Sequence, residues 1–141
     1  MSASDRIQGL AHVGIAVRSR DAAVAHWGNL GFRLTGTEDL ESMHVRIAFV
    51  ESGGLTIELL EATQPDSPIG RFLAKRGEGL HHVALYVADL ESSLTRAEAQ
   101  GLELIDRTPR EGSHHTKIAF LSPRTLNGVL VELCERRSIP R

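Results

Sequence analysis

Residues 10–17 read LAHVGIAV and residues 80–87 read LHHVALYV, so one segment occurs twice in this chain, 70 positions apart. Three other features recur in the same order: a glycine that ends a polar stretch (Gly31 and Gly101), a short apolar run (46–50 and 117–121), and a strand-like run around a glutamate (57–61 and 131–135). The offset between the copies drifts only from 70 to 74 residues. Similarity that keeps its order over four segments indicates an internal duplication.

The hydrophobic pattern within each copy predicts the order β-α-β-β-β. The first strand of each copy alternates between apolar and small or polar residues, as a half-buried strand does. In the first copy we expect Asp21 to cap a helix that ends at Gly31. The predicted elements of this copy are a strand at 12–17, a helix at 21–30, and strands near 32–37, 45–50 and 56–60, with a turn at 53–54.

The second copy is expected to match. Its Asn127-Gly128 pair is a strong signal for a hairpin turn. The predicted elements are a strand at 80–87, a helix at 90–99, and strands near 103–107, 116–121 and 129–133. Between the copies, Ser67-Pro68 is typical of a capped helix start with proline in the first turn.

The length of 141 residues allows one ordinary domain. We expect a single domain over 1–141, with module one at about 8–62, a linker helix at about 63–77 and module two at about 78–135. The 41% hydrophobic and 24% charged fractions are those of a globular chain. The net charge of −2 gives no basic footprint for nucleic acid.

Membrane and secretion signals are missing from the sequence. No apolar run approaches the roughly 20 residues that a membrane helix needs, and residues 1–6 lack the apolar core of a secretion signal. The single cysteine, Cys134, is typical of a reducing compartment. We therefore expect a cytoplasmic protein, in which Cys134 packs as a small hydrophobic residue.

The duplication places one histidine and one glutamate at matched positions in each copy. His12 and His82 lie on the first strands, and Glu58 and Glu132 on the last. Strand alternation sets each histidine on the face of the small residues, opposite the aliphatic side chains. Two imidazoles and two carboxylates suit a divalent ion such as zinc, cobalt, nickel or manganese.

A single histidine on a strand is more often structural than a ligand, and a glutamate on an edge strand is usually solvated. The recurrence of both types in register favours metal ligation, with a degenerate copy that keeps the residues without the metal as the alternative. The other histidines carry weaker signals. His44 and His114 are related by the repeat, 70 positions apart, and each lies just before a predicted strand.

The chain resembles the vicinal oxygen chelate superfamily, which includes glyoxalase I, extradiol dioxygenases and methylmalonyl-CoA epimerases. The passage IELLE at 57–61, DSPI at 66–69 and RGEGLHHVA at 76–84 is most similar to the epimerases, as is GVLVELCE at 128–135. The resemblance covers residues 8–135. It implies an α+β fold of tandem β-α-β-β-β modules that form a cupped mixed eight-stranded sheet around a metal site.

The resemblance also implies an activity. His12, Glu58, His82 and Glu132 match the four metal ligands of the family, one divalent cobalt, nickel, manganese or zinc ion is the cofactor, and the assembly is a homodimer. The implied reaction interconverts (R)- and (S)-methylmalonyl-CoA by α-proton abstraction through a metal-stabilised enolate. Glu132 is the first candidate for the base, and the candidates for a second base are Glu41, His44 and His114.

The sequence departs from the epimerase pattern at the start of the third strand of the first copy. Some family members carry a glutamate there, whereas this chain reads MHVRI at 43–47. Two alternatives therefore stay open: a glyoxalase I-like lyase that acts on a glutathione hemithioacetal, and a non-catalytic binding protein on the same scaffold. An extradiol dioxygenase fits less well, because its site uses two histidines and one carboxylate.

Overall fold

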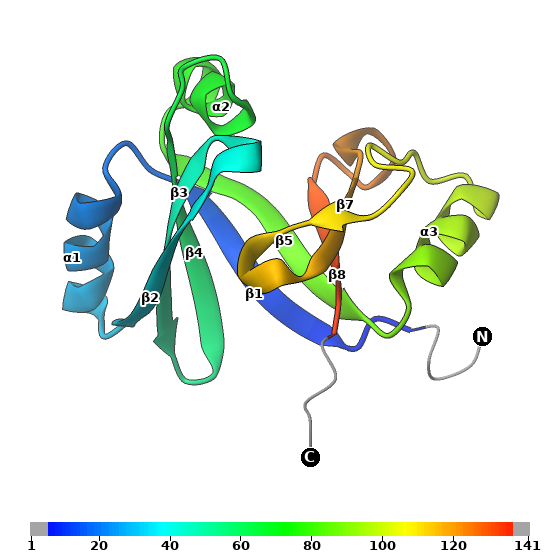
Figure 1. Cartoon of the computed structure of the whole chain (residues 1–141), viewed down its shortest axis with the longest axis horizontal. Coiled ribbons are helices and arrows are strands. Elements are labelled where there is room, and N and C mark those ends of the chain that lie inside the picture. Colours follow the sequence, from blue (N-terminus) through cyan, green and yellow to red (C-terminus); the bar gives the residue numbers. More distant parts are fainter. Residues whose placement is uncertain (1–5, 137–141) are drawn as a thin grey trace. The chain divides into compact units, whose positions relative to one another are not determined.

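A computed structural model of the chain describes residues 6–136. Residues 1–5, on which the expectation about secretion depends, lie outside the described residues. The elements, labelled in Figure 1, are β1 (Gly9–Ala16), α1 (Arg20–Leu30), β2 (Arg33–Leu40), β3 (Val45–Ser52), β4 (Leu55–Ala62), α2 (Pro68–Arg76), β5 (Gly79–Val87), α3 (Leu90–Ala99), β6 (Arg110–Glu111), β7 (Lys117–Leu121) and β8 (Val131–Glu135). Short 3₁₀ turns lie at Glu41–Met43 (η2), Ser113–His115 (η3) and Pro123–Thr125 (η4).

The chain divides into two compact units. The N-terminal unit comprises His12–His81, and the C-terminal unit comprises the residues from His82 onward together with the chain up to Ala11. Within the N-terminal unit the strand order is β2-β3-β4-β1, with β1 parallel to β4 and the other neighbours antiparallel. Within the C-terminal unit the order is β5-β8-β7-β6, with β5 parallel to β8. Each unit therefore repeats one topology.

Strand β1 contributes to both units. Its residues up to Ala11 belong to the C-terminal unit. There the N–H of Gln8, just before the strand, donates to the carbonyl oxygen of Tyr86 at 2.8 Å. The strand order therefore continues through β1 as β2-β3-β4-β1-β5-β8-β7-β6. This order confirms the predicted α+β class of two β-α-β-β-β modules with a mixed eight-stranded sheet.

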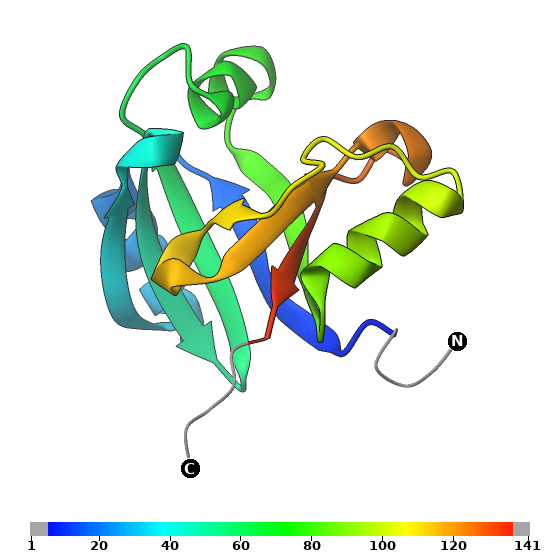
Figure 2. The same cartoon turned by 45° about the vertical axis from the view of Figure 1, so that its right-hand side comes forward.

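Helix α1 begins one residue earlier than expected. Ser19, not Asp21, is the N-cap, and its side chain accepts a hydrogen bond from the N–H of Ala22 at 3.2 Å. Asp21 lies in the first turn, where a carboxylate favours the positive end of the helix dipole. Gly31 ends the helix in the left-handed conformation, with φ of 115°, as predicted. Figure 2 shows α1 on one face of β2, β3 and β4.

The sheet of the N-terminal unit is buried on both faces, because β3 alternates between two apolar clusters. Ala48 and Val50 pack with Ala23 of α1 on one face. Ile47 and Phe49 pack with Ile69 and Leu73 of α2 and with Leu60 of β4 on the other. The second face is also the face of Glu58, because Phe49 stands opposite Glu58 in the β3–β4 ladder.

Helix α2 begins at the predicted place. Ser67 is its N-cap, accepts a hydrogen bond from the N–H of Gly70 at 3.2 Å and donates one to the carbonyl oxygen of Gln64 at 2.7 Å. Gly70 is required by the close approach of the preceding loop. A Cβ atom there would lie 2.5 Å from the carbonyl oxygens of Gln64 and Pro65.

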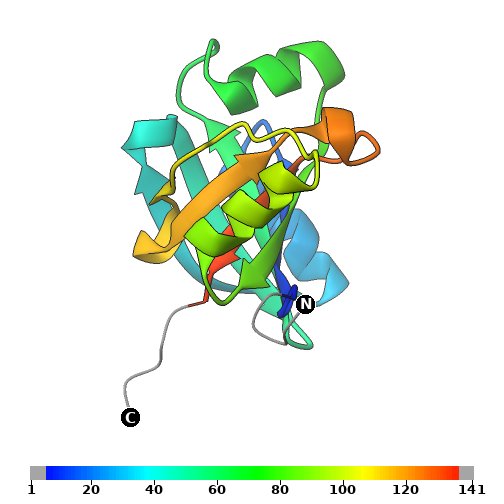
Figure 3. The same cartoon turned by 90° about the vertical axis from the view of Figure 1, so that its right-hand side faces the viewer.

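In the C-terminal unit, α3 packs against the sheet through Leu90 and Leu94, which join a cluster with Ala119 and Leu133. Figure 3 shows α3 lying across β7 and β8. Asp89 caps the helix by accepting a hydrogen bond from the N–H of Ser92 at 3.0 Å. Among the helices of residues 6–136, none is long and apolar enough to span a membrane.

The strand predicted at 103–107 does not form. That segment makes one isolated bridge, between Leu104 and Leu121, and the short strand β6 follows at Arg110–Glu111. The ladder is irregular here: the N–H groups of Ile105 and Asp106 both donate to the carbonyl oxygen of Phe120, and the Asp106 side chain accepts from the N–H of Phe120 at 2.9 Å. Asn127 and Gly128 have φ of 58° and 82°, but the turn they make follows η4, so β8 begins at Val131 and not at 129.

Candidate metal centre

His12 and Glu58 form a buried pair in the N-terminal unit. The histidine lies on β1, the glutamate on the parallel neighbour β4, and Gly14 stands opposite Glu58 in the ladder. His12 Nδ1 lies 3.3 Å from Glu58 Oε2, and the two residues are 6% and 5% exposed. The small side chains of His12's face, Gly14 and Ala16, leave room for this contact, as the strand alternation predicted.

His82 and Glu132 form the matching pair in the C-terminal unit. They lie on the parallel neighbours β5 and β8, where Ala84 stands opposite Glu132. His82 Nε2 lies 3.1 Å from Glu132 Oε1, and both residues are buried. The duplication therefore repeats the histidine–glutamate pair as well as the order of the strands.

The donor set fits a divalent cation. A buried carboxylate is costly unless a hydrogen bond, an opposite charge or a metal compensates for the lost water. Each unit meets that cost with one imidazole, and imidazole and carboxylate are both ligands of zinc, cobalt, nickel and manganese. The structure thus brings together His12 with Glu58 and His82 with Glu132, in each case two of the predicted ligands.

The three candidates for a second base all lie on the surface. Glu41 begins the turn η2, and His44 ends it in the left-handed region with φ of 52°. His114 lies inside η3 with φ of 56°. Glu41, His44 and His114 are exposed, in contrast to the four buried ligand candidates. The repeat thus preserves an unusual backbone conformation at His44 and His114.

Sequence reasoning missed two phenylalanines beside the carboxylates. Phe49 stands opposite Glu58 in the β3–β4 ladder, and Phe120 stands opposite Glu132 in the β7–β8 ladder. The Phe120 ring also meets the His82 ring edge to face, with centroids 5.7 Å apart. The repeated runs at 46–50 and 117–121 held the signal, because each places its phenylalanine at the same strand position.

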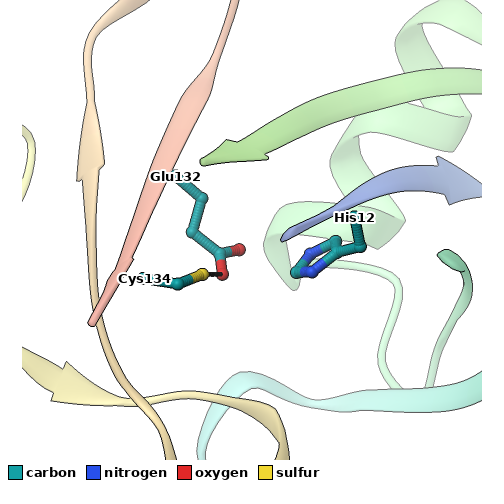
Figure 4. Close-up of side chains that lie close together, drawn as sticks. All are labelled: His12, Glu132 and Cys134. Carbon is teal, nitrogen blue, oxygen red and sulfur yellow. Dashed lines mark hydrogen bonds between the residues drawn. The ribbon is translucent and has the colours of Figure 1, made fainter. Parts of the chain in front are cut away.

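Cys134 was expected to pack as a small hydrophobic residue, and this expectation is incomplete. The residue is buried, but its thiol lies against the candidate ligand two positions before it on β8. Figure 4 shows the contact: Cys134 Sγ lies 3.0 Å from Glu132 Oε2, within hydrogen-bonding distance. Residues two apart on a strand share a face, so the spacing of Glu132 and Cys134 was a signal available in the sequence.

The chain is thus an α+β protein of two repeated modules, with a buried histidine–glutamate pair in each. Residues 11–120 match the model of the glyoxalase/bleomycin resistance protein/dioxygenase superfamily. The chain belongs to this superfamily, which is the family that the sequence resemblance indicated.

Relatives of this chain include an uncharacterized protein and an epimerase of CoA thioesters. The chain is 46% identical to the uncharacterized protein YqjC of Bacillus subtilis (strain 168), over 89% of this chain and 91% of YqjC. It is 35% identical to the ethylmalonyl-CoA/methylmalonyl-CoA epimerase of Cereibacter sphaeroides, over 88% of this chain and 95% of the epimerase.

A solved structure is similar throughout. It is a variant of the Streptomyces coelicolor methylmalonyl-CoA epimerase in complex with 2-nitronate-propionyl-CoA. The TM-score is 0.90 at 34% identity, over 96% of this chain and 99% of the other. Homologues about 35% identical to this chain are thus methylmalonyl-CoA epimerases, and its fold is theirs.

Proposed function

We propose that this protein is a metal-dependent epimerase that interconverts the (R) and (S) forms of methylmalonyl-CoA. The observation that carries the proposal is the buried histidine–glutamate pair repeated in the two units. Epimerases about one-third identical over nearly the full chain support the same conclusion. The substrate is therefore taken to be a small branched diacid held as its CoA thioester.

In this proposal one divalent ion, of cobalt, nickel, manganese or zinc, is held by four side chains. The ligands are His12, Glu58, His82 and Glu132. Two carboxylates supply the negative charge that a divalent ion requires, and the imidazoles bind it as neutral ligands. When bound, the ion would supply Lewis-acid stabilisation of the negative charge that develops on the thioester oxygen of the substrate.

Glu132 is the proposed base that removes the α-proton. A carboxylate has two oxygens, so one can ligate while the other accepts a proton. The Phe120 ring lies beside Glu132 on the same face of the sheet and limits the access of water to the carboxylate. With bulk water kept away from the carbanion, the proton is delivered by positioned side chains and not by random solvent molecules.

Epimerisation requires that a proton can be delivered to either face of the planar carbanion. We propose that the second proton carrier is one of three residues: Glu41, His44 or His114. Histidine titrates near neutral pH and can both accept and donate a proton. His44 and His114 also share a left-handed backbone, with φ of 52° and 56°.

The proposal also covers the partners of the protein, its assembly and its compartment. The partner molecule is an acyl-CoA, and nucleic acid and membrane have no part in the function. We further propose a homodimer that works in the cytoplasm, in keeping with a single buried cysteine and a net charge of −2.

The decisive experiment follows the α-proton. Metal-loaded protein is incubated with (S)-methylmalonyl-CoA in D₂O, and deuterium at the α-carbon is measured by mass spectrometry while chirality is followed by chromatography. The proposal expects deuterium incorporation together with racemisation. Turnover of a methylglyoxal–glutathione hemithioacetal without this exchange would instead establish a lyase. Binding of methylmalonyl-CoA or of the hemithioacetal with no turnover would establish a binding protein.

A further inference from the structure

The two units differ at one position on the face that carries the histidine–glutamate pairs. The residue two positions after Glu58 is Leu60, which packs in the apolar core with Phe49 and Leu73. The residue two positions after Glu132 is Cys134, which contacts the carboxylate itself. The repeat thus keeps the carboxylates, but the residue two positions after the glutamate is a hydrogen-bond donor only in the C-terminal unit.

Each oxygen of Glu132 has a close partner. Oε1 lies 3.1 Å from His82 Nε2, and Oε2 lies 3.0 Å from Cys134 Sγ. A thiol is a weak donor to a neutral acceptor, but an ionised carboxylate strengthens a hydrogen bond roughly twofold. Two partners on opposite oxygens oppose rotation of the carboxylate about its last side-chain bond.

We propose that Cys134 is a positioning residue for Glu132. Its S–H donates to Oε2 and fixes the plane of the carboxylate, so that Glu132 presents its oxygens in one orientation while Glu58 has no such constraint from Leu60. This inference rests on the proposed function, in which Glu132 is the base. Cys134 itself forms no bond to substrate and exchanges no proton with it.

Infrared spectroscopy tests the hydrogen bond without any reaction. Cys134 is the only cysteine of the chain, so the S–H stretching band of metal-free protein belongs to this residue alone. The band is expected below the position of a free thiol, because donation weakens the S–H bond. Glu132→Ala should return it to the free position. A wild-type band at the free position, or one that Glu132→Ala leaves unchanged, would overturn the proposal.

Steady-state kinetics then test whether the hydrogen bond from Cys134 affects catalysis. Two variants with side chains of similar size are compared. Cys134→Ala removes the donor and should lower kcat about tenfold, the effect of one hydrogen bond to a charged group. KM should change less than twofold. Cys134→Ser restores a donor and should recover kcat to within about threefold of wild type. Equal losses in the two variants, or full activity of Cys134→Ala, would contradict a positioning role.

Two further measurements separate the possible causes. Metal content and thermal unfolding of both variants show whether either has lost the ion or the fold, and kcat is compared per metal-loaded protein. Wild-type protein that fails the deuterium-exchange assay yet shows the shifted S–H band would refute the epimerase assignment and leave the Cys134–Glu132 contact established. Active wild-type protein with an unshifted band would refute the positioning role alone.

Discussion

Phe120 and Glu132 stand directly opposite each other in the β7–β8 ladder, and both residues are buried. Directly opposed residues of an antiparallel pair lie on one face with their Cβ atoms about 5 Å apart. The same relationship joins Phe49 to Glu58 in the other unit. The duplication therefore preserved a phenylalanine opposite each carboxylate along with the carboxylate, and an apolar neighbour favours a site that excludes water.

Removal of one histidine should cost the protein its metal. His82→Ala deletes one of four proposed ligands and leaves Glu132 buried without its imidazole, so the protein is expected to purify with far less than one divalent ion per chain. Elemental analysis of purified protein measures this directly. His26→Ala is the matched control, because His26 is exposed on α1. Stoichiometric metal in His82→Ala would contradict the ligand assignment.

The two glutamates should respond differently to the same isosteric change. Glu132→Gln removes the proposed base and should lower kcat by about 10²–10⁴-fold, the usual contribution of a general base. Glu58→Gln keeps an oxygen ligand and removes no proton carrier, so its kcat should fall by less than about tenfold. Steady-state rates of metal-loaded proteins decide the matter. Similar losses in both variants would place the base elsewhere.

Two glycine-to-alanine changes in helices should have opposite signs. Gly28→Ala in α1 meets no atom within 4 Å and should stabilise the protein by about 0.5–1 kcal/mol, because alanine is the better helix former. Gly70→Ala in α2 puts a methyl group 2.5 Å from two backbone carbonyls and should destabilise by about 1–3 kcal/mol. Urea unfolding measures both. A stable Gly70→Ala protein would mean that the loop at 64–65 moves freely.

Lys117 should make the stability depend on pH in the alkaline range. Glu135 and then Glu91 raise the pKa of Lys117, through contacts of 3.4 and 3.5 Å. Because the pKa is higher in the folded state, the stabilisation is complete below the ordinary value of 10.5 and is lost as the pH rises through the folded pKa. Lys117→Met should therefore be slightly less stable than wild type at neutral pH and equal to it at strongly alkaline pH.

An arginine at the same position provides the control. Its guanidinium stays charged beyond pH of about 12, so Lys117→Arg should keep its stability where wild type has lost the contribution of Lys117. Urea midpoints at several alkaline pH values report the difference. Parallel pH profiles for wild type and Lys117→Met would show that the ion pairs contribute nothing to folding.

The parts of this protein that the sequence predicted are those that depend on local pattern and on the repeat. Strand alternation placed His12 and His82 on the correct faces, and the cap and proline at Ser67-Pro68 marked the start of α2. The strand expected at 103–107 does not form, because Ile105 and Asp106 share one backbone acceptor of β7 and the Asp106 side chain satisfies a backbone donor of β7. Such a hydrogen bond joins residues far apart in the chain, and no local pattern reports it.

The sequence by itself determined the duplication, the strand faces and the identity of the four paired side chains, because each of these follows from spacing along one chain. Only the tertiary structure decided which atoms meet. Strand register brought Phe120 against Glu132 and Phe49 against Glu58, and side-chain packing turned Cys134 toward a carboxylate oxygen. Register and packing are set by contacts between distant segments, and the chemistry of the carboxylates depends on those contacts.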